Sequence, residues 1–215
     1  MQASTKRVET FSDGVIAIII TIMILELKLP AFKNPANEDI EAHVIKILPH
    51  LGAYVFSFIM LGIIWMNHHH FFNLLERTDN FLLALNLLLL FWMSLIPFVT
   101  GIMGENPLLP LSTALYGGVL LLTTLTFSYM RYYTLKNELV HTDEQRDINL
   151  YIKKLSRKNT RKNYIATGAY LLSIPLAFVN VYFSFICFLT PIVIFMLPGG
   201  IEEGKLADKV IEKNS

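Results

Sequence analysis

The chain has 215 residues, of which 53% are hydrophobic and 16% are charged, and its mean hydropathy is +0.49. Because a soluble domain carries charge on about 25% of its residues, this composition excludes an ordinary soluble protein and indicates a multi-pass membrane protein. The net charge of +1 gives no indication for or against a nucleic-acid partner, and none is expected. The single cysteine, Cys187, excludes an internal disulfide or a cysteine-based metal site.

The first predicted transmembrane helix spans residues 8–29. Its uncharged core, Gly14–Leu25, has only 12 residues, whereas a lipid-facing helix needs about 20 apolar residues to cross a bilayer. Asp13 precedes this core and Glu26 follows it. Ionisable groups at such depths normally face protein or a water-filled path. We therefore predict that this helix is shielded from lipid by the other helices.

The helix has a distinct apolar stripe with a single hydroxyl. At about 100° per residue, the residues on this stripe are Phe11, Gly14, Ile18, Thr21, Ile22, Leu25 and Leu29. Asp13 points roughly opposite to Ile18. A purely structural interpretation stays open, in which Ile18 and Leu25 pack against other helices and the Thr21 hydroxyl bonds its own backbone.

The second predicted helix spans residues 47–69 and ends in a cluster of polar and aromatic side chains. This cluster contains Trp65, Asn67, His68, His69 and His70. Consecutive residues on a helix point about 100° apart, and chelating histidine pairs need i, i+4 spacing. The histidine run therefore predicts no metal site, and no cofactor is expected. Trp65 is predicted to anchor the helix at the membrane interface.

The sequence Arg7-x-x-x-Phe11-Ser12-Asp13 resembles the start of the first helix in the transmembrane protein 175 family. This family comprises potassium channels of endolysosomes and their bacterial relatives. The resemblance implies that the first helix lines a pore and that one six-helix repeat assembles as a homotetramer. It also implies that the cluster ending the second helix packs on the Phe-Ser-Asp motif, which gives structural roles to Trp65, Asn67, His68 and His69 as well as to Arg7, Phe11, Ser12 and Asp13.

The remaining predicted helices span residues 79–100, 110–132, 164–179 and 182–198, with a cytoplasmic connector at 133–163. Pro97 is expected to kink the end of the third helix, and Gly117 and Gly118 are expected to permit close approach between helices. The 39 uncharged residues from Asn163 to Ile201 are few for two spans, so one long helix is an alternative to two short ones broken at Asn180.

Basic residues predict the orientation in the membrane. With six spans, fifteen Lys and Arg residues lie on one side and only Lys28, Lys33 and Lys46 on the other. Because cytoplasmic segments are rich in Lys and Arg, both termini are predicted to be cytoplasmic. The expected location is the cell membrane, and the resemblance to the bacterial relatives implies a bacterial inner membrane. The basic connector offers a possible contact with anionic lipid.

The sequence thus predicts an all-α membrane protein with six transmembrane helices per subunit, the first lining the central pore of a tetramer. The expected function is a potassium-preferring cation channel. Because no TVGYG-like filter is present, selectivity would come from Thr21, and Ile18, Ile22 and Leu25 would form hydrophobic constrictions. Alternatives are a secondary cation transporter, a proton-permeable leak pathway, a membrane enzyme and a scaffold without transport activity.

Overall fold

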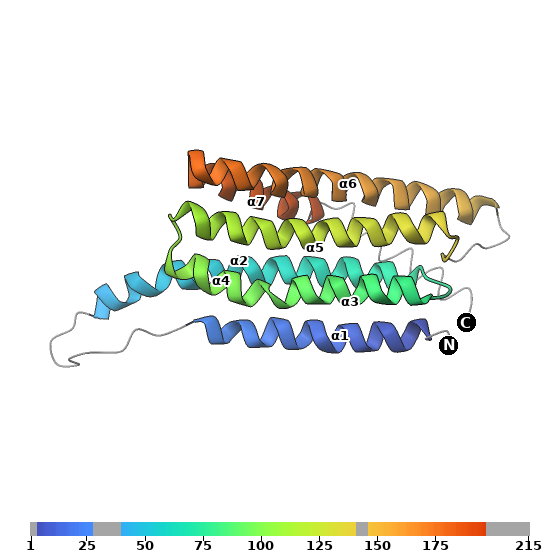
Figure 1. Cartoon of the computed structure of the whole chain (residues 1–215), viewed down its shortest axis with the longest axis horizontal. Coiled ribbons are helices and arrows are strands. Elements are labelled where there is room, and N and C mark those ends of the chain that lie inside the picture. Colours follow the sequence, from blue (N-terminus) through green and yellow to red (C-terminus); the bar gives the residue numbers. More distant parts are fainter. Residues whose placement is uncertain (1–3, 28–39, 141–145, 197–215) are drawn as a thin grey trace.

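The computed structural model describes residues 4–27, 40–140 and 146–196, which form helices joined by short turns. Figure 1 shows the long helices running side by side along one axis, with α1 at one side of the bundle and α6 at the other. The prediction of an all-α protein is confirmed. In chain order the elements are α1 (Thr5–Ile22), the 3₁₀ helix η1 (Met23–Glu26), α2 (Ile40–Asn73), α3 (Asn80–Ser94), α4 (Ile96–Glu105), α5 (Pro110–Lys136), α6 (Arg146–Val179) and α7 (Val181–Met196).

Four helical stretches in the described part of the chain are long and apolar enough to cross a membrane. These are Thr5–Glu26, Ile47–Asn73, Asn80–Glu105 and Pro110–Lys136, and Val181–Phe195 forms a shorter apolar helix. α6 packs against both α5 and α7. A break at Asn180 separates α6 from α7, so this region forms two helices and not one long helix. Whether these last two helices span the membrane stays a prediction.

The third predicted helix differs from the structure at its end. It consists of α3 and α4, joined at Leu95, and it continues to Glu105, where a loop was expected. Pro97 lies in the first turn of α4, where the missing backbone N–H removes no helical hydrogen bond. The proline therefore starts a new helix in line with the old one and does not end the span.

The start of α3 is fixed by Asp79. The backbone N–H of Leu82 donates to Asp79 Oδ1 at 2.7 Å, and the Tyr133 hydroxyl of α5 donates to Asp79 Oδ2 at 2.6 Å. One oxygen thus caps α3, and the other ties it to α5. A capping aspartate contributes about 1 kcal/mol to helix stability.

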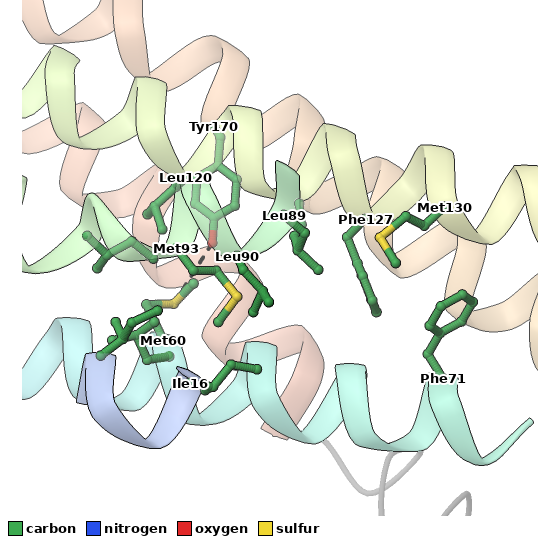
Figure 2. Packing of buried hydrophobic residues seen from close by; sticks show 14 of the residues in the cluster. Ile16, Met60, Phe71, Leu89, Leu90, Met93, Leu120, Phe127, Met130 and Tyr170 are labelled. Carbon is green, nitrogen blue, oxygen red and sulfur yellow. Dashed lines mark hydrogen bonds between the residues drawn. The ribbon is translucent and has the colours of Figure 1, made fainter. Parts of the chain in front are cut away.

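The core of the bundle is built from large apolar side chains of several helices (Figure 2). Ile16 attaches α1 to this core and is fully buried, as is Met93 of α3. From α6, the Tyr170 hydroxyl reaches into this core and approaches the Met60 sulfur of α2 at 3.9 Å. The inner face of α1 therefore packs on a core that the other helices share.

Gly117 and Gly118 lie at different distances from α6. A Cβ atom at Gly117 would lie 2.5 Å from Ser173 Oγ and 3.2 Å from the Phe188 ring, whereas one at Gly118 would have nothing within 4 Å. Only Gly117 permits the close approach that the sequence predicts for both.

This difference gives a test of α5–α6 packing. Gly117→Val is expected to destabilise the protein, because overpacking a helix contact costs about 1–3 kcal/mol. Gly118→Val is the matched control and is expected to leave stability nearly unchanged. Thermal unfolding of the detergent-purified variants measures both effects. Equal melting temperatures for the two variants would contradict the packing described here.

Candidate functional site

The outer face of α1 and η1 is exposed in the single chain. Leu25 is 70% exposed and Ile18 is 58% exposed. The other exposed positions of the predicted stripe are Phe11, Gly14, Thr21 and Ile22, while Leu29 lies outside the described residues. The stripe therefore forms a continuous apolar surface with one hydroxyl, which the other described residues of the chain leave uncovered.

The opposite face of α1 is buried. Ser12, Ile16, Ile19 and Met23 point into the bundle, so the helix has an inner face that fixes its orientation. Because the inner face is buried against α2, α3 and α4, the outward direction of Ile18 and Thr21 is set by the packing of the whole bundle.

Thr21 has a defined hydroxyl geometry. Its Oγ1 donates to the backbone carbonyls of Ala17 and Ile18, at 3.0 Å in each case. A hydroxyl has one proton and two acceptor lone pairs. Since the proton is used inside the helix, the exposed oxygen of Thr21 is left with acceptor character toward the outside.

The end of this exposed surface that η1 forms packs closely against α4. Leu25 and Glu26 lie in η1, and the Glu26 carboxylate occupies the place that a side chain at Gly101 of α4 would take. The absence of a side chain at Gly101 lets η1 approach α4.

Asp13 lies on the side of α1 that contacts α2. Its Oδ1 accepts a hydrogen bond from the indole N–H of Trp65 at 3.0 Å, and the Trp65 ring stacks on His69 with 5.9 Å between ring centroids. A carboxylate that accepts a hydrogen bond forms a stronger contact than a neutral acceptor. Asp13 and Trp65 thus connect α1 to α2 near the start of α1.

A buried chain of hydrogen bonds joins α1, α3 and α2. The Ser12 hydroxyl donates to the Val8 carbonyl at 2.8 Å, and the Asn86 amide donates to Ser12 Oγ at 2.8 Å. Asn86 Oδ1 lies 2.9 Å from His68 Nε2. Because an amide oxygen only accepts, His68 carries its proton on Nε2.

Asn86 is the residue of this chain that sequence reasoning did not assign to the motif. Its signal is that Asn86 is the only amide side chain, and Ser94 the only hydroxyl, between Phe81 and Val99 of the third predicted helix. A second buried group of hydrogen-bonded side chains connects α4, α2 and α5. The Thr100 hydroxyl donates to Ser57 Oγ at 2.7 Å, and Ser57 Oγ lies 2.8 Å from the Tyr116 hydroxyl.

Replacing Asn86 with leucine is expected to lower the melting temperature. The change leaves His68 Nε2–H without its acceptor, and a buried unsatisfied donor costs about 1–3 kcal/mol. Ser94→Ala is the control, because Ser94 is exposed on the same helix and bonds only its own backbone. A melting temperature for Asn86→Leu equal to that of the control would show that the chain of hydrogen bonds adds nothing to stability.

Two predicted motif residues make no contact with the motif in one chain. The Asn67 amide donates to the Ile63 carbonyl of its own helix at 2.8 Å. Arg7 is exposed and forms no ion pair with the described residues. By contrast, His69 Nδ1 lies 3.1 Å from a Glu9 carboxylate oxygen. Among the described residues, the structure therefore connects Asp13, Trp65 and His69 in one set of contacts. It connects Ser12 and His68 in another through Asn86. Neither set includes Arg7, Phe11 or Asn67.

The chain closely matches a bacterial relative along nearly its whole length. It is 35% identical over 208 residues to a protein named potassium channel from Chryseobacterium sp., and the match covers 97% of this chain and 96% of the relative. The chain belongs to the TMEM175 family. A sequence model of that family, described as "Endosomal/lysosomal potassium channel TMEM175", matches residues 7–97, and the family predicted from the Arg-x-x-x-Phe-Ser-Asp sequence is confirmed.

Other TMEM175 proteins resemble the chain in fold and in part of the sequence. A crystal structure of a lysosomal potassium-selective channel TMEM175 homolog from Chamaesiphon minutus superimposes with a TM-score of 0.74 at 28% identity, covering 88% of this chain and 95% of that one. The endosomal/lysosomal proton channel TMEM175 of Gallus gallus is 31% identical over 108 residues, which cover 47% of this chain and 22% of the relative. TMEM175 proteins are ion channels, which are not an enzyme class.

Proposed function

We propose that the chain is one subunit of a homotetrameric, potassium-preferring cation channel in the cell membrane. Four copies of α1 surround the pore in this proposal, and both termini are cytoplasmic. The observation that carries it is the uncovered apolar face of α1, with Thr21 as its hydroxyl. Potassium is the permeant ion, and no cofactor is needed.

In this proposal the exposed apolar face of α1 packs against other copies of the chain. The predicted membrane helix has only 12 uncharged core residues, and ionisable ends at that depth favour protein or water over lipid. Four α1 helices around an axis would shield one another from lipid. Two bacterial relatives are named potassium channels. These names support the proposal that the axis between the four α1 helices is a pore.

Ile18, Ile22 and Leu25 are proposed to form the hydrophobic constrictions. A narrow ring of such side chains offers an ion nothing in place of its hydration shell. Thr21 is proposed to provide the selective ring, because its outward oxygen keeps two lone pairs. Arg7, which has no ion pair among the described residues, is proposed to contact a neighbouring subunit.

A proton-permeable pathway is the second candidate function. It is supported by the vertebrate relatives, which are named proton channels. A secondary cation transporter is a third candidate. Flux of potassium down its own gradient, without any coupled gradient, separates a channel from a transporter, and acidification of a vesicle lumen under a potassium diffusion potential reports proton passage.

The pore assignment is tested by cysteine modification in a Cys187→Ser background. Leu25→Cys is expected to lose most potassium current on exposure to a charged methanethiosulfonate reagent. Leu171→Cys is the matched control, since Leu171 is exposed on α6, away from α1, and its current is expected to persist. Native mass spectrometry of the purified protein measures the subunit number. Block of Leu171→Cys but not of Leu25→Cys would place the pore elsewhere.

A further inference from the structure

Three side chains that commonly bind metal ions meet near the start of α1. They are Glu9 and Asp13 of α1 and His69 of α2, and one ligand atom from each lies within 4.8 Å of the others. The Glu9 and His69 side chains are 18% and 43% exposed. The group therefore lies at the edge of the single chain, although the His69 Nδ1 atom itself is buried, and the two helices keep the ligands together.

Neighbouring side chains orient two of these ligands. Trp65 donates to one oxygen of Asp13, which leaves the other carboxylate oxygen available. The His69 ring stacks on Trp65, and its Nε2 lies 3.2 Å from the Asn73 amide. Rotation of the Asn73 side-chain amide by a half-turn exchanges its nitrogen and oxygen, so that the oxygen accepts from a protonated Nε2 of His69. With its proton on Nε2, the His69 ring has an unprotonated Nδ1 that can bind a metal ion.

We propose that Glu9, Asp13 and His69 form a binding site for a divalent transition-metal ion such as Zn²⁺. One imidazole and two carboxylates match the ligands that Zn²⁺ accepts, whereas Mg²⁺ and Ca²⁺ prefer oxygen ligands alone. The remaining coordination positions are left for water.

Metal binding would require only small changes in the distances between the three ligand atoms. Ligand atoms about 2.1 Å from a tetrahedral ion lie about 3.4 Å apart. His69 Nδ1 and Glu9 Oε1 are already 3.1 Å apart. The Glu9 side chain is flexible, so rotation of its carboxyl group and of the Asp13 carboxyl group can close the rest of the distance without moving a helix.

Sequence patterns alone do not predict this site. Glu9 and Asp13 have i, i+4 spacing and lie on one face of α1, but their partner comes from a distant part of the sequence. The consecutive histidines 68–70 also point in different directions. Only His69 of the three belongs to the group of ligand atoms.

An ion at this site would connect α1 directly to α2. If α1 lines the pore, as proposed above, widening the constrictions requires α1 to move relative to the helices behind it. The bound ion would resist this movement, so we expect a divalent metal ion on the cytoplasmic side to reduce potassium flux. This step rests on the proposed function, whereas metal binding itself does not.

Binding is measured first, on purified protein without a histidine tag. Titration calorimetry with Zn²⁺ is expected to show one ion per chain. Glu9→Gln and His69→Gln are each expected to weaken binding by at least about tenfold, because even the loss of an outer contact of a metal ligand commonly costs about 10–100-fold in affinity. His70→Gln is the control, because it removes the adjacent imidazole, which is not one of the three ligands. The wild type and all three variants are first shown to elute at the same volume.

Two results would overturn the site. The first is an absence of Zn²⁺ binding by the wild type, and the second is an equal loss of affinity in His70→Gln and His69→Gln. In proteoliposomes, Zn²⁺ is expected to reduce the potassium flux of the wild type but not that of Glu9→Gln. If Zn²⁺ binds but leaves wild-type flux unchanged, the proposed coupling to α1 is wrong. If no flux occurs in any sample, the channel proposal fails and the binding measurement still decides the site.

Discussion

Replacing Asp13 with alanine is expected to prevent recovery of an assembled channel. The carboxylate accepts the Trp65 N–H, and a hydrogen bond to a charged group contributes about 1.5–3 kcal/mol. Asp13 remains only partly buried in the single chain, so a neighbouring subunit has access to its second oxygen. Size-exclusion chromatography of the solubilised variant, compared with the wild type, measures the assembled fraction.

Trp65→Phe is the control that separates the two contributions. It removes only the N–H donor and keeps an aromatic ring to stack on His69. If Trp65→Phe assembles while Asp13→Ala does not, the carboxylate stabilises the assembly through a contact other than the Trp65 N–H. If Asp13→Ala assembles normally and only its conductance changes, Asp13 belongs to the ion path and the structural role proposed here is wrong.

Helical periodicity separated the apolar stripe of α1 from the face that carries Asp13. The stripe containing Ile18 and Thr21 is exposed, and Ser12 on another face is buried. The direction of a helical side chain depends on local geometry, at about 100° per residue, and can therefore be read from the sequence. Whether the exposed stripe lines a pore stays a prediction. The break at Asn180 was predicted from the residue type, with one long helix left open as the alternative. In the structure Asn180 Oδ1 accepts the Tyr182 N–H as a helix cap.

The partners of the motif were harder to predict, because they depend on long-range packing. Ser12 meets Asn86, 74 residues away, and no local pattern specifies such a pair. The cluster at the end of α2 was expected to supply the contacts as a group. In the structure Trp65 and His68 reach the motif, whereas Asn67 bonds its own backbone. The last boundary of the third span was missed because Pro97 has opposite effects in the middle and at the start of a helix.

Thr21→Val is expected to lower the preference for potassium over sodium without preventing assembly. The two side chains have nearly the same shape, but valine has no oxygen to replace water around a dehydrated cation. Replacing that water costs less for potassium than for the more tightly hydrated sodium. Thr124→Val is the matched control, because Thr124 on α5 makes the same type of bond to its own backbone, at 2.8 Å, away from α1. Reversal potentials under bi-ionic potassium and sodium measure the preference.

Ile18→Asn is expected to raise the leak current. This outcome would distinguish the residue that closes the pore, Ile18, from the residue that selects the ion, Thr21. Ile18 and Thr21 lie one helical turn apart, about 4.5 Å along the axis. Four isoleucines close a narrow pore by excluding water, whereas four asparagines keep it wet. The expected result is therefore a larger basal current with a nearly unchanged reversal potential, the reverse of the effect of Thr21→Val. If Thr21→Val keeps the wild-type reversal potential while Ile18→Asn shifts it, the discriminating ring is Ile18 and size, not hydroxyl coordination, sets the preference. An assembled wild-type protein that conducts no current in a bilayer would remove the channel proposal altogether.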